Sequence, residues 1–202
     1  FAFHAQTTDK ILIALDNGRF YTLGGDKLPG ARGFGEPIRT MVDIDSDVQI
    51  VAAMPHKPKA QLLLASNVAR GFAVESDEIL AETRKGKAVM STKPGMRLVI
   101  VREIPPEHDH VAVVGDNRKL VIFSLEELPV LAKGQGVTLQ RYRDGGMSDV
   151  TTLKLEEGLS WTMGGDTGRT RTEKDMVMWK VARGAAGRLP PNGFPRDNKF
   201  SA

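Results

Sequence analysis

The chain has 202 residues, of which 41% are hydrophobic, so it can bury the core of one large domain or two small ones. It contains no cysteine, which excludes disulfides, a thiolate metal site and a cysteine nucleophile, and no apolar run approaches the roughly 20 residues of a membrane helix. The net charge of +3 and the eight basic against four acidic residues in 159–202 are compatible with a polyanionic partner.

Residues 1–10, FAFHAQTTDK, lack a basic segment followed by an apolar one, so no signal peptide is predicted. Because the first residue is Phe1 rather than Met, we expect the chain to be part of a longer protein. The first predicted element is KILIALDNGRFYTL at residues 10–23, in which two short apolar runs flank the letters DNG. Asn-Gly between such runs indicates a β-hairpin, because a tight primed turn needs positive φ at its centre.

The hairpin pattern recurs with a period near 50 residues, the range of propellers and solenoids. A basic residue follows each predicted turn at intervals of 51, 49 and 50, namely Arg19, Arg70, Lys119 and Arg169. Each unit has about four short strands rich in β-branched residues, and such a unit buries both faces only by stacking against its neighbours. We therefore expect an all-β, propeller-like disc. Its predicted repeats are 7–57, 58–108, 109–158 and 159–202, with residues 1–6 in part of a further blade.

A segment rich in glycine and basic residues lies between the second and third predicted strand of each unit. The four copies read GARGFGEP (30–37), ETRKGKAV (82–89), AKGQGVTL (132–139) and ARGAAGRL (182–189). Glycine lets the backbone turn or approach another group closely. A single copy is equally well explained as a solvated loop, whereas four copies at matching positions favour cations repeated around the disc.

These repeats resemble the C-terminal domain of the A subunit of bacterial type IIA topoisomerases, over essentially all 202 residues. The clearest stretch is DKILIALDNGRFYTLGGDKLPGARGFGEPI at residues 9–38. The family fold is a β-pinwheel, a disc of about five four-stranded blades that exchange strands with their neighbours. Gyrase members are expected to carry a box with the sequence QRRGGKG, and only incomplete matches occur, at 32–35, 84–87 and 133–136. The missing box favours topoisomerase IV over gyrase.

The resemblance implies a non-catalytic domain that binds and bends DNA for ATP-dependent strand passage, in decatenation, supercoil relaxation and chromosome segregation. The implied partners are double-stranded DNA, the B subunit of topoisomerase IV through the rest of the protein, and a chromosome-organising protein, in the cytoplasm at the nucleoid and away from membranes. Mg and ATP are expected in the rest of the enzyme and no cofactor here. The candidate DNA-binding residues are Arg19, Arg32, Arg70, Arg84, Lys85, Lys87, Lys119, Lys133, Arg169, Arg171 and Arg183.

Two further arginines are weaker candidates for DNA contact. Arg141 and Arg143 flank Tyr142, which we expect, like Tyr21, to be a packing residue in a strand rather than a nucleophile. A protein-interaction propeller is the rival hypothesis. A variant keeps both roles, with DNA on one rim and a chromosome-organising protein on another face, and the acidic residues Glu103, Glu107 and Asp109 either serve that face or are simply solvated. The rivals differ in whether the repeated cations form one continuous basic stripe.

Metal and nucleotide motifs are incomplete. The calcium-like run at 43–47 has Val48 where the loop needs glycine and Met54 where it needs glutamate. His108-Asp109-His110 has only two other histidines in the chain to complete a site, so no metal is expected. The paired glycines at 33–35 and 134–136 lack the third glycine of a dinucleotide loop.

Overall fold

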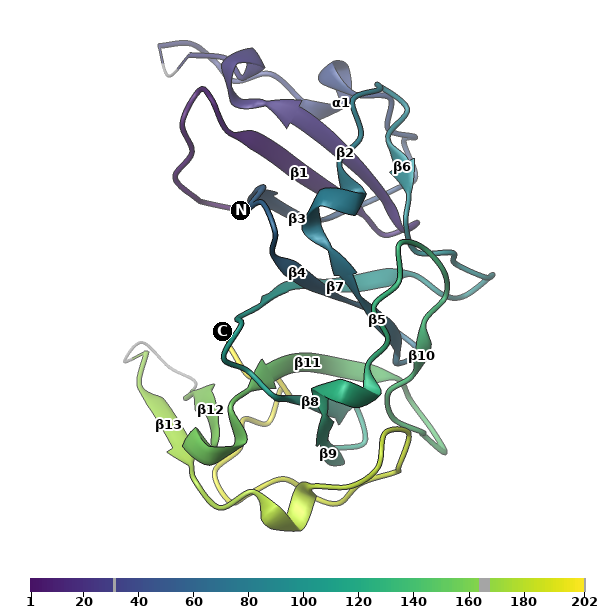
Figure 1. Cartoon of the computed structure of the whole chain (residues 1–202), viewed down its shortest axis with the longest axis vertical. Coiled ribbons are helices and arrows are strands. Elements are labelled where there is room, and N and C mark those ends of the chain that lie inside the picture. Colours follow the sequence, from purple (N-terminus) through teal and green to yellow (C-terminus); the bar gives the residue numbers. More distant parts are fainter. Residues whose placement is uncertain (31, 164–167, 202) are drawn as a thin grey trace.

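The computed structural model describes residues 1–30, 32–163 and 168–201, and its strands form four sheets, which we call blades 1 to 4 (Figure 1). Across the sheet, blade 1 has the order β3 (Ile50–Pro55), β1 (Lys10–Leu15), β2 (Arg19–Gly24), β6 (Lys87–Ala88). Blade 2 has the order β7 (Leu98–Ile104), β4 (Gln61–Ser66), β5 (Arg70–Glu75), β10 (Val137–Thr138). Blade 3 has β11 (Met147–Leu153), β8 (His110–Gly115) and β9 (Leu120–Ser124), and blade 4 has β12 (Leu159–Thr162) and β13 (Thr170–Glu173).

Helical structure in these described ranges is confined to single turns. The α-helical turn is α1 (Ile38–Met41), and 3-10 turns occupy Gly25–Lys27, Ser76–Ile79, Leu125–Glu127, Leu155–Glu157 and Val177–Trp179. None of the helices in the described chain has the length and apolar character to cross a membrane. Because every helix in the described ranges is a single turn, the expected all-β class is confirmed.

The hairpin turns form where the sequence predicts them. The residue before each repeated basic position has positive φ, 83° at Gly18, 56° at Ala69 and 61° at Arg118. Each turn joins the two central strands of its blade, as in the pairing of Ala14 with Phe20 between β1 and β2. The fourth predicted turn includes Asp166 and Thr167, which lie outside the described residues.

Three blades take an edge segment from the next repeat, which is the exchange that defines a pinwheel. Lys87 in β6 pairs with Phe20 in β2. Val137 in β10 pairs with Gly71 in β5, and Arg188 pairs with Leu120 at the start of β9. In every case the donor segment crosses to the preceding blade. Figure 1 shows β6 and β10 on the outer, right-hand side of a curved row of sheets, with both termini on the inner side.

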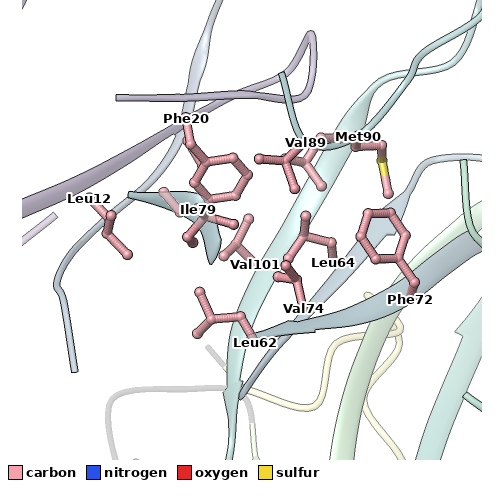
Figure 2. Packing of buried hydrophobic residues seen from close by; sticks show 13 residues of the cluster. Leu12, Phe20, Leu62, Leu64, Phe72, Val74, Ile79, Val89, Met90 and Val101 are labelled. Atoms are coloured by element: carbon pink, nitrogen blue, oxygen red, sulfur yellow. The ribbon is translucent and has the colours of Figure 1, made fainter. Parts of the chain in front are cut away.

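The core lies between the blades, as expected for units that bury their faces by stacking. Figure 2 shows Leu12 and Phe20 of blade 1 together with Leu64 and Phe72 of blade 2 in one cluster. Two further clusters join blade 2 to blade 3 and blade 3 to blade 4. A fourth cluster covers the other face of blade 1 and is built from residues 11–50 alone.

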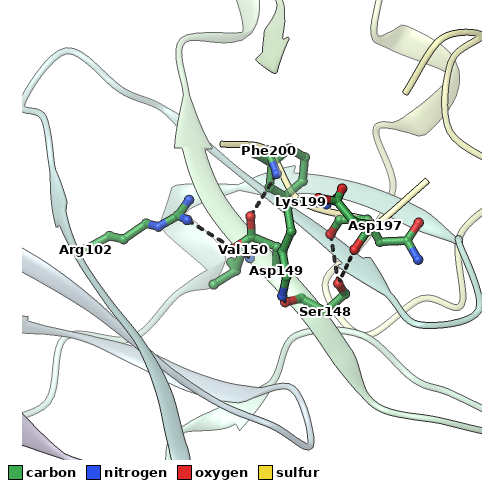
Figure 3. Close-up of polar contacts among 8 residues, drawn as sticks. Arg102, Ser148, Asp149, Val150, Asp197, Lys199 and Phe200 are labelled. Atoms are coloured by element: carbon green, nitrogen blue, oxygen red, sulfur yellow. Dashed lines mark hydrogen bonds and ion pairs between the residues drawn. The ribbon is translucent and has the colours of Figure 1, made fainter. Parts of the chain in front are cut away.

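Asp149 in β11 joins blades 2 and 3 to the C-terminal segment (Figure 3). Its side chain is only 2% exposed, and its carboxylate lies 3.2 Å from the Arg102 guanidinium of β7. The second oxygen accepts a hydrogen bond from the Phe200 amide at 2.9 Å. Next to it, the Ser148 hydroxyl donates to the Asn198 carbonyl at 2.8 Å. Since a buried carboxylate needs such partners, these contacts fix the blade 2–blade 3 junction and the end of the chain together.

Two details differ from the expectations. Residues 1–6 contain no strand, so the described chain forms four sheets where about five were expected. Tyr142 lies outside the strands, although its hydroxyl is buried and its ring packs beside Gly115. Tyr21 lies in β2 as predicted and donates its hydroxyl to the Asp43 carbonyl at 2.6 Å.

Candidate nucleic-acid interface

The exchanged segments form the candidate interface. We call residues 84–88, 133–138 and 180–188 the outer rim, because each is the part of a repeat that lies along the second strand of the preceding blade. The rim carries seven basic residues and no acidic residue, namely Arg84, Lys85, Lys87, Lys133, Lys180, Arg183 and Arg188. The whole chain has a net charge of +3, so the remainder is net acidic and positive charge is concentrated at the rim.

A glycine allows each rim segment to approach its acceptor strand. Gly86, Gly136 and Gly187 have φ values of 67°, 74° and 84°. A Cβ at these three positions would lie 2.5, 2.2 and 2.5 Å from the main-chain oxygens of Phe20, Gly71 and Leu120. The repeated glycine therefore allows the main chains of two successive repeats to come into contact. This contact places the basic residues next to the glycine on the rim.

Arg19 and Arg70, at equivalent positions of blades 1 and 2, hold the rim segments by their main-chain oxygens, and Arg183 joins the third rim segment to the second in a similar way. Nη2 of Arg19 donates to the Lys85 carbonyl at 2.6 Å, and Nη2 of Arg70 donates to the Gly136 carbonyl at 2.7 Å. Nη1 of Arg183 donates to the Thr138 carbonyl at 2.8 Å. These three candidates thus lie at the rim, with part of their hydrogen-bonding capacity used inside the protein.

Blade 3 holds its rim segment differently. The position equivalent to Arg19 and Arg70 is Lys119, whose side chain is exposed. Gln140 takes over the bridging role, since its Nε2 donates to the carbonyls of Lys119 and Ala186 at 2.8 and 3.0 Å. The lysine ammonium is consequently available to solvent at this blade.

The exposed rim cations are the groups best placed to contact phosphates. Lys85 and Lys133 are exposed, and no acidic side chain within the described chain pairs with either. Arg84 lies 3.5 Å from the Asp43 carboxylate in a solvent-exposed pair, which contributes little to stability. Lys87 donates to the Glu78 carbonyl.

Three candidates lie away from the rim. Arg32 belongs to the exposed loop after β2, and Arg169 and Arg171 belong to the exposed edge of blade 4. The Arg171 guanidinium stands 5.8 Å from the centroid of the Trp161 ring, in a cation–π contact. The structure therefore brings together eight of the eleven candidates: Arg19, Arg70, Arg84, Lys85, Lys87, Lys119, Lys133 and Arg183.

Two rim cations were missed from the sequence, and two weaker candidates lie beside them. Lys180 and Arg188 belong to the rim, and the signal for Arg188 was its place after Gly187, which matches Gly86-Lys87. Arg141 and Arg143 are both exposed, and the Arg141 amide donates to the Ala185 carbonyl at 3.3 Å.

Tyr142, between these two arginines, is a packing residue in the structure. Burial, with a smaller effect from the negative charge of Asp116, raises the pKa of the Tyr142 hydroxyl well above its usual value. A phenol that resists deprotonation in this way is a poor nucleophile, which agrees with its packing role.

Two of the three residues of the proposed acidic surface have partners within the protein. Glu103 forms an exposed ion pair with Lys57 at 2.9 Å. Asp109 accepts hydrogen bonds from His110 Nδ1 at 2.7 Å and from the Leu155 amide at 2.9 Å. Slight burial acts to raise the pKa of the Asp109 carboxyl, but the two hydrogen bonds outweigh it, so this pKa is lowered. Over the ranges that the structure describes, no three His, Asp or Glu residues are placed to hold a metal ion.

No family model matches the chain. The A subunit of DNA topoisomerase 4 from Rickettsia bellii is 41% identical over 201 residues, and the one from Caulobacter vibrioides is 42% identical over 197 residues. These matches cover 100% and 97% of this chain but only 26% and 25% of the relatives. The chain therefore spans about a quarter of the curated relatives it matches.

Solved structures share the fold at low sequence identity. The Escherichia coli ParC C-terminal domain aligns with a TM-score of 0.81 at 21% identity, over 95% of this chain and 80% of that one. A DNA gyrase A C-terminal domain aligns with a TM-score of 0.65 at 15% identity, over 91% of this chain and 60% of that one. Together with the repeats and the exchanged strands, these matches show that the chain belongs to the family of C-terminal β-pinwheel domains of topoisomerase IV A subunits.

Proposed function

We propose that this domain binds double-stranded DNA along its outer rim, without sequence preference, and presents it to the strand-passage machinery of topoisomerase IV. The chemistry within the domain is binding and bending only. Cleavage of DNA, ATP hydrolysis and Mg binding belong in this proposal to the rest of the enzyme, which includes the B subunit.

The observation that carries the proposal is the charge of the exchanged segments. Seven cations and no anion occupy three segments that repeat at the same place on successive blades. Lysine and arginine at such a surface neutralise phosphates and release counterions, which supplies binding that is independent of base sequence. The rim residues come from repeated loops rather than from a helix or ribbon that could enter the major groove, so base reading is not expected.

The curvature of the row of blades fits bending. Smooth bending of a 20–30 bp duplex by 40–90° costs on the order of 1–6 kcal/mol, which a single blade cannot offset. Cations on three successive blades can together offset this bending energy, because each blade neutralises phosphates in a different part of the same duplex. The wider roles that we propose are decatenation, supercoil relaxation and chromosome segregation in the bacterial cytoplasm, as parts of the complete enzyme.

The rival scaffold hypothesis has less support. Of the three acidic residues, Glu103 and Asp109 are already paired with Lys57 and His110, which leaves the exposed Glu107 as a single carboxylate rather than an acidic patch. A chromosome-organising protein remains a proposed second partner of the complete enzyme.

Binding of the 202-residue chain to duplexes of increasing length, at several salt concentrations, tests the proposal. We expect affinity to rise with length until the duplex spans the three rim segments. We also expect log K to fall linearly with log[salt], with a slope of about −4.5 to −6.3 for five to seven phosphate contacts. Different sequences of the same length should bind alike in fluorescence anisotropy. Absence of duplex binding at low salt would reject the proposal in favour of the scaffold.

A further inference from the structure

Three large apolar side chains are exposed at the two ends of the third rim segment. Val177 and Met178 come just before it and are 71% and 60% exposed, and Leu189 comes just after it and is 66% exposed. The two ends lie together, because Nε1 of Trp179 donates to the Leu189 carbonyl at 2.8 Å. We call Val177, Met178 and Leu189 the apolar patch. Within the described part of the chain, none of the hydrophobic clusters includes any of the three.

Two residues of the apolar patch belong to a turn that repeat 3 lacks. In repeat 3 the buried Leu128 lies two residues before Val130, which pairs with β5. In repeat 4 the corresponding interval, from the buried Met176 to Lys180, which pairs with β9, is four residues. The two additional residues form the turn Val177–Trp179, the short coil at the lower end of Figure 1. Its last residue packs against the blade 3–blade 4 cluster, whereas the first two face solvent.

The surroundings of the apolar patch are cationic. Lys180 follows it at one end of the rim segment and Arg188 precedes it at the other, and the main chains of both pair with β9. Residues 176–196 contain no aspartate or glutamate. Asp175, the residue before this range, accepts a hydrogen bond from the Val177 amide at 3.3 Å. A surface that covers the patch must therefore carry negative charge on either side of it.

We propose that the apolar patch contacts the minor groove of the duplex held along the outer rim, an inference that rests on the proposed function. The walls of this groove are deoxyribose rings, which lie between two rows of phosphates. Minor-groove proteins combine basic side chains with apolar ones such as Met and Leu. A turn with two projecting residues suits a groove about 6 Å wide. Because the sugar is the same at every base pair, this contact keeps binding independent of sequence.

A protein partner explains the apolar patch less well. A stable protein interface buries about 800 Å² on each partner and involves about 20 residues or more. The apolar patch has three residues, and the rim segment between its two ends carries Lys180, Arg183 and Arg188. The small apolar area and the neighbouring cations together favour a polyanion with a narrow apolar groove.

Salt dependence distinguishes this contact from phosphate contacts. Burial of apolar surface releases no counterions, so its contribution to log K is the same at every salt concentration. The triple variant Val177→Thr, Met178→Gln and Leu189→Gln should therefore bind duplex about 10-fold more weakly at all salt concentrations, with an unchanged salt slope. Anisotropy titrations measure both quantities. Urea unfolding should show unchanged stability, because the three side chains are exposed.

Three exposed phenylalanines provide the matched control. Phe1, Phe3 and Phe34 are 80%, 41% and 103% exposed and lie outside the rim segments, so their replacement by glutamine should leave DNA affinity unchanged. Equal weakening by the control would overturn the inference. Unchanged affinity of the patch variant would also overturn it, in favour of a protein partner, and the proposed function would stand if loss of rim cations still weakened binding. Absence of duplex binding by the unmodified chain would overturn both.

Netropsin, a small molecule that fills the minor groove of A·T tracts, tests the groove assignment. Its positive charge weakens the binding of both proteins to an A·T duplex, but only the unmodified chain has an apolar contact to lose. The ratio of the affinities of the unmodified chain and the patch variant should therefore fall from about 10 to about 1 when netropsin saturates the duplex. A ratio that stays near 10 would overturn the assignment to the minor groove.

Discussion

Gly136→Ala is expected to lower the free energy of unfolding by about 3–5 kcal/mol, because a Cβ at this position combines backbone strain with a clash that cannot relax. The backbone has φ of 74°, and the added carbon would lie 2.2 Å from the Gly71 carbonyl oxygen. The acceptor is main chain in a central part of blade 2, so the exchanged strand β10 must withdraw from β5. Urea unfolding followed by circular dichroism measures the change.

Gly95→Ala is the matched control for backbone strain alone. Its φ is 81°, but nothing lies within 4 Å of the position of an added Cβ. Its expected effect is therefore about 1–2 kcal/mol, the cost of a left-handed conformation for a residue with a side chain. If the two variants lost equal stability, close contact between exchanged strands would not be what requires glycine at 136.

The second large effect concerns DNA affinity. Replacing Arg84, Lys85 and Lys87 together by glutamine removes all cations of the rim segment on blade 1. We expect duplex binding to weaken by about 10- to 100-fold at low salt, equally for all sequences, because each lost phosphate contact removes released counterions. The magnitude of the salt slope should fall by about 2–3. Anisotropy titrations at several salt concentrations measure both quantities.

A triple variant with the same loss of charge controls for the net charge of the domain. Lys10, Lys57 and Lys59 lie outside the rim segments, and Lys10 and Lys57 pair with Glu82 and Glu103. Their replacement by glutamine should change affinity much less than the rim variant. Equal weakening by the two triple variants would show that overall charge, rather than the rim, governs binding.

Most of the fold can be predicted from the sequence, because each repeat contains local signals for its hairpin turn and its strands. The Asn-Gly turn and its equivalents give the positive φ at Gly18, Ala69 and Arg118, and the alternating runs on either side form β1, β2 and their counterparts. The direction of exchange does not follow from these signals. Whether residues 87–88 pair within their own unit or with blade 1 depends on contacts between repeats, which the pattern of one repeat does not contain.

The candidate site was predicted less completely than the fold. Periodicity located the rim cations, but it assigned the same role to Arg19 and to Lys85, whereas the guanidinium of Arg19 holds the Lys85 carbonyl. Arg188 was missed because the fourth repeat is degraded and its loop aligns by a single glycine. Side-chain partners of this kind depend on the folded geometry and have no local sequence signature.

The most direct test of the account is protection of single cysteines on the domain by bound duplex. The chain has no cysteine, so Lys85→Cys, Lys133→Cys and Arg188→Cys each place one thiol on the rim, and Lys57→Cys places one outside it. With a saturating duplex of about 40 bp, long enough to follow several blades, maleimide should label the three rim thiols at least about tenfold more slowly. Labelling at position 57 should be unchanged. Protection at position 57 with unchanged labelling at the rim would contradict the claim that the exchanged segments hold the DNA.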